Sequence, residues 1–343
     1  MLADRIIKDD LIESYLAENK FSNAIERLFE LQKKEWQDLQ NNYSALSDIQ
    51  SNTFYFDGFR IKTQLNPGRI TSTSAKTDKV NILQRNCFLC EHNLPDHQKG
   101  IMINESMILL INPFPIFPLH LTIPHTNHIE QEILKHFDLF VDCAKKIGTD
   151  FTLMYNGPKC GASAPDHFHF QACKKNLLPV DDDFHQLKNE YGETLLRNDL
   201  VEVTTIDDSL RKIISIETND SRILLHTFSL IILHLQKFLF TDEEPKVNLL
   251  CSYEEDHGWR VIIFLRSKHR PEIYFSEKDD KLLFSPAVVD VAGLCITPLE
   301  KDFIRLDKNL ITKIFNEVFI SPNEFYQFTS ELAELLSYDS FND

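Results

Sequence analysis

Polar and apolar side chains alternate strictly from residue 167 to residue 172. The polar positions are His167, His169 and Gln171, and the positions between them carry phenylalanine and alanine. Successive side chains of a β-strand point to opposite faces, so this segment is predicted to be a strand with one polar and one buried face. The two histidines and the glutamine would then share a surface on a rigid support.

The first fifty residues have the pattern of helices. Apolar residues recur at helical spacing between residues 11 and 39, and glycine and proline are absent from the segment. Residues 1–50 are therefore predicted to be a helical N-terminal extension. From residue 53 the pattern changes to β-rich runs on either side of Asp57-Gly58, a dipeptide typical of a hairpin turn.

The remaining elements suggest a repeated order. In the first half, after a loop at 66–79, we predict strands at 101–104, 107–112 and 119–123, a helix at 129–147, a strand at 151–155, a loop at 156–166 and the motif strand at 167–173. In the second half the corresponding elements are a strand at 212–216, a helix at 221–240 and strands at 247–253 and 259–265. The last of these has no histidine pair. We predict an α+β fold with two related halves, 51–200 and 201–343, one active and one degenerate, with mixed antiparallel sheets flanked by helices.

Charge limits the partners that this protein can have. The chain of 343 residues is 43% hydrophobic and 26% charged, an ordinary globular composition, and its formal net charge is -16. Affinity for phosphate polymers comes from surplus lysine and arginine, so neither a nucleic acid nor an anionic membrane is an expected partner. Any phosphate that the protein binds should meet a local basic pocket.

The sequence favours a cytoplasmic location. The start of the chain carries several charges and no apolar core followed by a cleavage site, unlike a secretory signal. The oily stretch 223–240 is interrupted by His226, His234 and Lys237, which predicts a buried helix and not a membrane span. Seven scattered cysteines fit free thiols in a reducing compartment better than a disulfide framework.

The residues of the motif suggest phosphoryl chemistry. An imidazole can attack phosphorus, and a neighbouring amide can donate hydrogen bonds to the oxygens of the transferred group. The loop before the strand adds glycines, which let backbone N–H groups approach an anion, together with Lys159 and the Ser163 hydroxyl. A histidine pair on a strand is also compatible with a purely structural role. Nucleotide transfer through a histidine is the leading hypothesis.

The string from His167 to Ala172 resembles the His-x-His-x-Gln signature of the histidine triad (HIT) superfamily. It is similar to the branch that holds galactose-1-phosphate uridylyltransferase, GDP-L-galactose phosphorylase and diadenosine tetraphosphate phosphorylase. Asn156, Gly157 and Ser163 resemble residues that precede the signature in the uridylyltransferase. Residues 112–124 and 155–171 also resemble a family of uncharacterised bacterial proteins. The resemblance covers residues 64–175 well and the second half weakly.

The resemblance implies an activity. In the transferases the second histidine of the signature, here His169, attacks the α-phosphorus, and Gln171 would stabilise the phosphoryl oxygens. The donor would be a nucleotide sugar or another nucleotide, and the acceptor phosphate or a hexose 1-phosphate. Hydrolases of the superfamily carry a third histidine where this chain has glutamine. A diadenosine polyphosphate phosphorylase, a nucleotide hydrolase and a non-catalytic nucleotide-binding protein remain as alternatives, and relatives are often homodimers.

A structural zinc is also implied by the resemblance. The pair Cys87 and Cys90 resembles the Cys-x-x-Cys of the uridylyltransferase, where a distant histidine and the first histidine of the signature complete the site. Carried over, the other ligands are His128 and His167, with His125 as the alternative to His128. Thiolates and imidazoles suit tetrahedral Zn²⁺. Free buried cysteines are the competing interpretation.

Further contacts with the nucleotide follow from weaker likenesses. Arg69 resembles the arginine that reaches the phosphates in the uridylyltransferase, and Gly161 belongs to the same phosphate-binding loop as Gly157. The hairpin that lines the base and ribose would contribute Asn112, Phe114 and Phe117, although the two phenylalanines fit a core equally well.

The densest basic cluster of the acidic chain lies in the second half. It contains Arg266, Lys268 and Arg270, directly after the strand that was matched to the motif strand. These residues are predicted to bind a phosphate or sugar phosphate. A solvated basic turn is the alternative.

Overall fold

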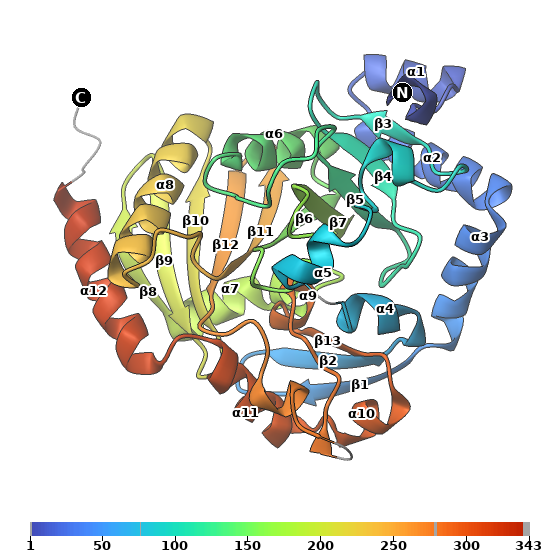
Figure 1. Ribbon diagram of the computed structural model, residues 1–343. Helices are drawn as coiled ribbons and strands as arrows, with labels where there is room; N and C mark the ends of the chain where they lie inside the picture. Colours follow the sequence, from blue (N-terminus) through green and yellow to red (C-terminus); the bar gives the residue numbers. More distant parts are fainter. Residues whose placement is uncertain (1, 76, 278–279, 339–343) are drawn as a thin grey trace.

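A ten-stranded antiparallel sheet forms the centre of the molecule in the computed structural model, which describes residues 2–75, 77–277 and 280–338 (Figure 1). Every pair of neighbouring strands is antiparallel. In spatial order the strands are β3 (Gly100–Met102), β4 (Ile108–Ile111), β5 (His120–Pro124), β7 (His169–Lys174), β6 (Phe151–Asn156), β11 (Val247–Glu254), β12 (Gly258–Leu265), β10 (Lys212–Thr218), β9 (Val201–Asp207) and β8 (Gly192–Arg197).

The sheet consists of two copies of one unit. Each unit has three strands, a helix and two strands: β3, β4, β5, α6 (Phe137–Ile147), β6 and β7 in the first copy, and β8, β9, β10, α8 (Ser221–Phe238), β11 and β12 in the second. The spatial order reads the same from either edge, with β6 and β11 paired at the middle. The predicted α+β duplication is confirmed, and β12 is the counterpart of the motif strand β7.

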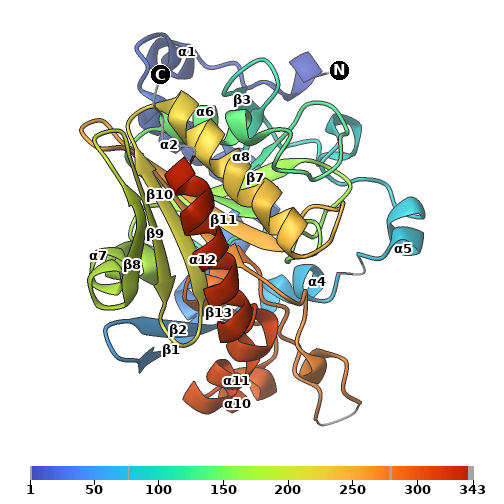
Figure 2. The same ribbon diagram turned by 90° about the vertical axis from the view of Figure 1, so that its left-hand side faces the viewer.

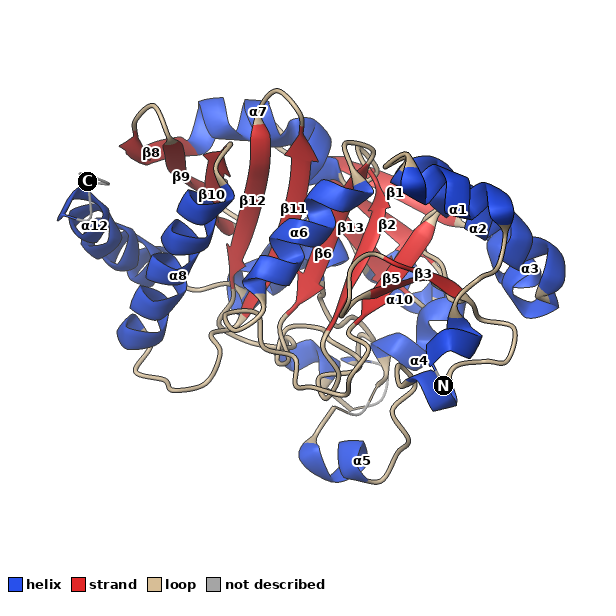
Figure 3. Cartoon of the chain, turned by 90° about the horizontal axis from the view of Figure 1, so that it is seen from above, coloured by secondary structure: helices blue, strands red, loops and turns tan. Residues whose placement is uncertain are grey.

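Helices cover both faces of the sheet. One face packs under α2 (Phe21–Glu35), α6, α8 and α12 (Pro322–Tyr338), and α8 and α12 cross it side by side (Figure 2). The other face packs against α7 (Pro179–Tyr191), α9 (Val288–Val291) and α11 (Lys308–Val318). In Figure 3, seen from above, α6 lies across β11 and β6 of the sheet. The large sheet is therefore covered on both sides, and nearly every residue of its central strands β6, β11 and β12 is buried.

A second, three-stranded sheet joins the two ends of the chain. The predicted hairpin is confirmed, with β1 (Gln50–Tyr55) antiparallel to β2 (Arg60–Leu65) and Gly58 at a φ of 71° in the turn. The late strand β13 (Leu294–Thr297) runs parallel to β2. This pairing carries the C-terminal segment against the N-terminal half, where it reaches the site described below.

The predicted N-terminal helices are present, and smaller elements complete the fold. Besides α2 they are α1 (Asp10–Ala17) and α3 (Gln37–Ser44), while α4 (Ile70–Thr73), α5 (Lys79–Leu83) and α10 (Glu300–Arg305) lie further along. Single turns of 3₁₀-helix occupy Leu2–Arg5, Ala45–Asp48, Pro67–Arg69, Glu91–Asn93 and Glu272–Tyr274.

The helix predicted at 129–147 begins only at Phe137. The preceding segment is held in another conformation by backbone hydrogen bonds to the motif: the Phe168 N–H donates to the Ile129 carbonyl (2.7 Å) and the Gln131 N–H to the Pro165 carbonyl (3.3 Å). Tertiary pairing thus overrides the apolar spacing that suggested a longer helix. The buried face of the motif strand is confirmed, since Phe168 and Phe170 are completely buried.

The oily segment around residues 223–240 forms a helix packed on the sheet, as predicted. Its buried side includes Leu224, Phe228 and Ile231. No helix within the described ranges is both long and apolar enough to cross a membrane. All seven cysteines are free thiols.

Candidate active site and metal centre

His169 begins strand β7, and its ring orientation is set by its own strand. Its Nδ1 lies 2.8 Å from the His167 carbonyl oxygen, which can only accept, so Nδ1 carries a proton and donates it. Burial lowers the pKa of His169 below its ordinary value, which favours the neutral ring. A neutral imidazole protonated on Nδ1 has its lone pair on Nε2. The side chain is 4% exposed.

The backbone of His169 is held by Gln131, whose side chain is buried. The His169 N–H donates to Gln131 Oε1 (2.8 Å), and Gln131 Nε2 donates to the carbonyl oxygens of His169 and Asn156, each at 3.0 Å. One side-chain amide therefore joins the ends of β6 and β7 where the loop between them departs. Sequence reasoning missed Gln131, because it lies in the segment that was predicted as helix.

Gln171 lies two residues after His169 and hence on the same face of the strand. Its Oε1 lies 2.8 Å from Nε2 of the buried His120 on β5. The strand register supports this contact, since Gln171 is opposite Thr122, two residues from His120. Sequence reasoning assigned His120 no role, although it lies in the segment that resembles the nucleotide-binding hairpin.

Asn156, at the end of β6, is held in a comparable way. Its Oδ1 accepts from Asn248 Nδ2 (2.9 Å) and from the Val288 N–H (2.7 Å). Asn248 is itself held by the buried Arg266, whose guanidinium donates to Asn248 Oδ1 at 2.8 Å. With its oxygen occupied by two donors, the Asn156 side chain has its NH₂ group available for a ligand.

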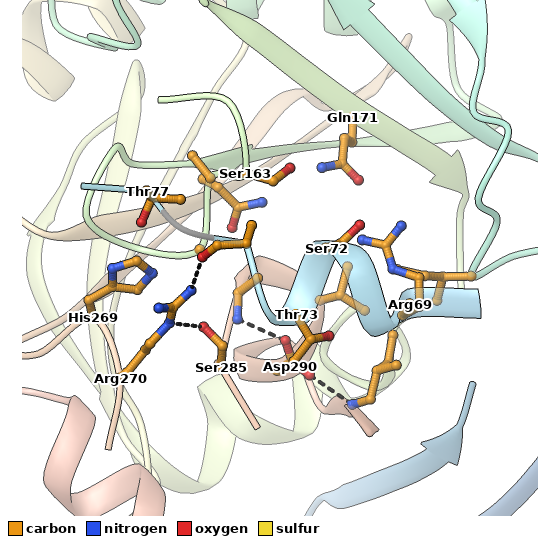
Figure 4. Close-up of a pocket in the computed structure, with 18 residues that line it drawn as sticks. Arg69, Ser72, Thr73, Thr77, Ser163, Gln171, His269, Arg270, Ser285 and Asp290 are labelled. Atoms are coloured by element: carbon orange, nitrogen blue, oxygen red, sulfur yellow. Dashed lines mark hydrogen bonds between the residues drawn. The ribbon is translucent and has the colours of Figure 1, made fainter. Parts of the chain in front are cut away.

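A cavity opens beside Gln171 and Asn156 (Figure 4). Three parts of the chain meet there: the segment after β2, the loop before the motif strand and the C-terminal segment delivered by β13. Its polar lining consists of Arg69, Ser72, Thr73, Thr77, Asn156, Gly161, Ser163, Gln171, His269, Arg270, Ser285 and Asp290. His169, the first residue of the motif strand, is not among the residues that line this cavity.

Two arginines give the cavity a positive lining. Arg69 donates to the Phe114 carbonyl (2.9 Å), and burial lowers its pKa to about 10, so it remains a cation at neutral pH. Arg270 donates to Ser285 Oγ (2.8 Å) and to the Ala75 carbonyl (2.9 Å). In a chain with a net charge of -16, this is the local basic pocket that an anionic ligand requires.

One carboxyl group lies among these donors. Asp290 accepts from the N–H groups of Ala287 and Ile296, both at 2.8 Å. Burial raises the pKa of Asp290 to about 7, which reduces its repulsion of an anion near neutral pH. Asp290 comes from the C-terminal half, and no local pattern in the sequence marks it.

The remaining phosphate-binding candidates lie away from the cavity lining. Lys159 is exposed and pairs with Glu243, and Lys268 is exposed and pairs with Glu272 and Glu317. Arg266 is buried and acts on Asn248, as described above.

Two further phosphate-binding candidates, Asn112 and Gly157, make contacts within the protein that support the fold. Asn112 Nδ2 donates to Thr122 Oγ1 (2.8 Å) within the β4–β5 hairpin. A Cβ atom at Gly157 would approach the Val247 carbonyl to 2.8 Å, so this glycine permits a close backbone approach. Of the two hairpin phenylalanines, Phe117 is in the core and Phe114 is 52% exposed.

The four residues proposed as metal ligands come together next to the start of the motif strand. The ligand atoms of Cys87, Cys90, His128 and His167 all lie within 4.8 Å of one another. Cys87 Sγ is 3.3 Å from His167 Nδ1, and Cys90 Sγ is 3.2 Å from His128 Nδ1. Sulfur and nitrogen ligands of one tetrahedral zinc lie roughly 3.5 Å apart, so the donor set and its spacing fit Zn²⁺.

The alternative ligand His125 is turned away from this cluster. Its Nδ1 accepts from the Asn127 N–H at 3.0 Å, while its carbonyl oxygen lies 2.7 Å from His167 Nε2. That contact places a proton on His167 Nε2 and leaves Nδ1 free to bind a metal. Among the described residues, His128 and not His125 completes the cluster.

Two family models match consecutive parts of the chain. The model described as "Domain of unknown function (DUF4922)" covers residues 28–174, and the one described as "GDPGP1-like, C-terminal domain" covers residues 188–338. None of the curated proteins matches the sequence significantly.

Solved structures of similar fold include those of yeast Ap4A phosphorylase Apa2. Its complex with AMP is 14% identical with a TM-score of 0.53, over 84% of this chain and 97% of that one. The structure of Apa2 without a named ligand is 16% identical with a TM-score of 0.53, over 83% of this chain and 94% of that one. The complex of Apa2 with Ap4A is 14% identical with a TM-score of 0.52, over 83% of this chain and 97% of that one. This likeness shows a shared fold, and with the GDPGP1-like match it supports the resemblance to the uridylyltransferase branch of HIT-like proteins.

Proposed function

We propose that this protein is a nucleotidyltransferase that moves a nucleoside monophosphate through a covalent intermediate on His169. The observation that carries the proposal is the hydrogen bond from His169 Nδ1 to the His167 carbonyl, which leaves the lone pair of the neutral ring on Nε2. Gln171, two residues further on the same face of the strand, lines the cavity. Similarity to a phosphorylase of nucleotides and to the GDPGP1-like domain supports the same class of reaction.

The reaction has two steps. His169 Nε2 attacks the α-phosphorus, so a P–N bond forms while the P–O bond to the leaving phosphate group breaks and that oxygen keeps the electron pair. An oxygen of the acceptor then attacks the same phosphorus, and the P–N bond breaks to restore the lone pair on Nε2. Gln171 donates to the phosphoryl oxygens as negative charge develops on them.

Residues of the cavity bind the phosphates in this proposal. Arg69 and Arg270 supply positive charge, and Asn156, Gly161 and Ser163 supply hydrogen-bond donors. Arg266 contributes through Asn248, which orients Asn156. Lys159, Lys268, Asn112 and Gly157 would contact a ligand only if it extends beyond the cavity.

We infer two classes of donor. A nucleoside diphosphate sugar is favoured by the likeness of the motif to GDP-L-galactose phosphorylase, with phosphate or a hexose 1-phosphate as the acceptor. A dinucleoside polyphosphate is the second candidate, because the fold is that of an Ap4A phosphorylase. Both use the same chemistry at the α-phosphorus and differ in the leaving group.

Gln171 argues for transfer to an acceptor and against hydrolysis. An amide does not titrate near neutral pH and so gives little help to an attacking water, in contrast to the third histidine of HIT hydrolases. The nucleotidyl-histidine should therefore persist until an acceptor arrives.

The test uses nucleotide sugars and Ap4A that are radiolabelled in the α-phosphate. Transfer predicts an acid-labile label on the protein that is absent in His169→Asn. The label should be retained in His97→Asn, a substitution on an exposed side chain that does not line the cavity. The label should be released as a new nucleotide when phosphate or a hexose 1-phosphate is added. Release of free nucleotide without an acceptor would indicate a hydrolase, and absence of both label and turnover would indicate a binding protein.

We also propose that Cys87, Cys90, His128 and His167 bind a structural zinc ion. Its chemical contribution would be to hold the loop at residues 87–90 against the start of the motif strand. His167 is both a ligand and the hydrogen-bond acceptor for His169, so this site supports the orientation of the nucleophile without touching the substrate.

A further inference from the structure

His120 is a fully buried polar side chain to which the proposed mechanism assigns no role. It lies on β5, and its ring packs edge-on against Phe117 with the ring centroids 5.4 Å apart. Its two nitrogens have different partners: Nδ1 accepts from the Ile116 N–H at 3.3 Å, and Nε2 lies 2.8 Å from Gln171 Oε1. The ring thus links the turn of the β4–β5 hairpin to the motif strand.

These partners define the tautomer of His120. A backbone N–H can only donate, so Nδ1 has to be the acceptor and the proton of the neutral ring is on Nε2. Burial, followed by the charge of Arg69, lowers the pKa of His120 to about 3, so the ring remains neutral around neutral pH. Nε2 is consequently a donor, and it can pair with the oxygen of the Gln171 amide but not with its NH₂ group.

We propose that His120 is a positioning residue that locks the Gln171 amide with its NH₂ group directed toward the cavity. If the Gln171 amide could flip, it would present its oxygen to the cavity as readily as its NH₂ group. That oxygen would repel a phosphoryl group. The identity of the bound group as a phosphoryl group rests on the proposed function, whereas the lock itself does not.

The neighbouring strand β6 carries a second amide that follows the same rule. Asn156 also has its oxygen occupied inside the protein, by Asn248 and the Val288 N–H, and it also lines the cavity. A side-chain amide by itself can present either its oxygen or its NH₂ group to a ligand. Because the oxygens of Gln171 and Asn156 are both occupied inside the protein, both amides present donors to the cavity. The arrangement selects a ligand that offers acceptor oxygens to both amides.

The first experiment examines the tautomer in the unmodified full-length protein. Nitrogen NMR of isotope-labelled histidine should show, near neutral pH, a neutral ring protonated on Nε2 for the signal that disappears in His120→Gln. A proton on Nδ1, or a charged ring, would overturn the lock. This measurement requires neither catalysis nor ligand binding, so it decides the inference even if the proposed function fails.

The second experiment measures AMP binding by calorimetry. His120→Leu, which has no donor, should weaken binding by about tenfold, the size of one lost charge-assisted hydrogen bond. His120→Gln can place an N–H near the position of Nε2 and should restore most of the affinity. In the Gln171→Ala background, His120→Leu should have no further effect.

The outcomes separate positioning from packing. One contrary result is that His120→Leu weakens AMP binding equally with and without Gln171, and another is that His120→Gln does not restore the affinity. Either result would mean that His120 contributes only by packing in the core and would overturn the proposal. Thermal unfolding of each variant identifies loss of fold, in which case the tautomer experiment decides. Absence of AMP binding in the unsubstituted protein would count against the proposed function, not against the lock.

Discussion

The side chain of Gln131 brackets the backbone of His169, accepting from its N–H at 2.8 Å and donating to its carbonyl oxygen at 3.0 Å. This is the hydrogen-bond pair that a neighbouring strand would normally supply. Because Gln131 Nε2 also donates to the Asn156 carbonyl, the bracket joins the nucleophile to the end of the neighbouring strand β6, where Asn156 lines the cavity. The proposed nucleophile is therefore held by protein contacts before any ligand binds.

Replacement of Gln131 with leucine should be strongly destabilising. The substitution keeps the volume but leaves buried backbone groups of His169 and Asn156 without partners, at a cost of about 2–4 kcal/mol. Urea unfolding measures the effect. Gln131→Glu keeps the acceptor for the His169 N–H, but its carboxylate cannot donate to the two carbonyl oxygens, so it should be destabilising as well. An unchanged midpoint for the leucine variant would show that water replaces the amide.

Arg270 and Lys268 should differ sharply in their effect on ligand binding. Arg270 lines the cavity, whereas Lys268 is held in surface ion pairs, although both lie in the same basic cluster. Calorimetry with ADP should show binding weakened by about tenfold or more in Arg270→Ala and almost unchanged in Lys268→Ala. Arg270→Lys keeps the positive charge without the guanidinium group, so its affinity for ADP tests whether charge alone is enough for binding. Equal effects of the two alanine substitutions would point to a general electrostatic contribution instead of a contact.

Zinc content should distinguish His128 from His125. The purified protein is expected to contain about one zinc per chain, and Cys87→Ser and His128→Asn should lose it. His125→Asn is the matched control, because only the backbone carbonyl of His125 contacts the cluster. Removal of zinc by a chelator should lower the unfolding temperature of the unsubstituted protein. Retention of zinc in His128→Asn with loss in His125→Asn would reverse the assignment.

Glu244 should make stability depend on pH. Burial raises its pKa from 4.5 to about 7, although Tyr155 and the Ile133 N–H donate to it. The folded state therefore holds this proton more tightly than the unfolded state, and stability falls as pH rises from about 4.5 to about 7.

The glutamine in Glu244→Gln cannot titrate, so this variant should not lose stability through position 244 as the pH rises. The difference in unfolding free energy between the variant and the unsubstituted protein should move in favour of the variant by about 1–3 kcal/mol across that interval. Glu243→Gln, on the exposed neighbour, is the matched control. Parallel pH profiles for Glu244→Gln and the unsubstituted protein would contradict the shift.

Local patterns in the sequence were enough to predict the motif strand and the duplicated unit. The alternation around Phe168 and Phe170 follows from strand geometry alone, and both side chains are in the core as predicted. The helix predicted from residue 129 begins later, because that segment pairs with the motif loop, and loop pairing has no local signal.

What only the tertiary structure decided is which distant groups meet. The family resemblance implied His128 as a metal ligand with His125 as its alternative, and the sequence offered three cations of one cluster as phosphate binders. The fold brings His128 to the cysteines, Arg270 to the cavity and Lys268 to surface carboxylates. It also adds His120 and Asp290, which no spacing indicated. The physical reason is range: periodicity reflects the geometry of one element, whereas a site is assembled from strand pairings between residues far apart in the chain.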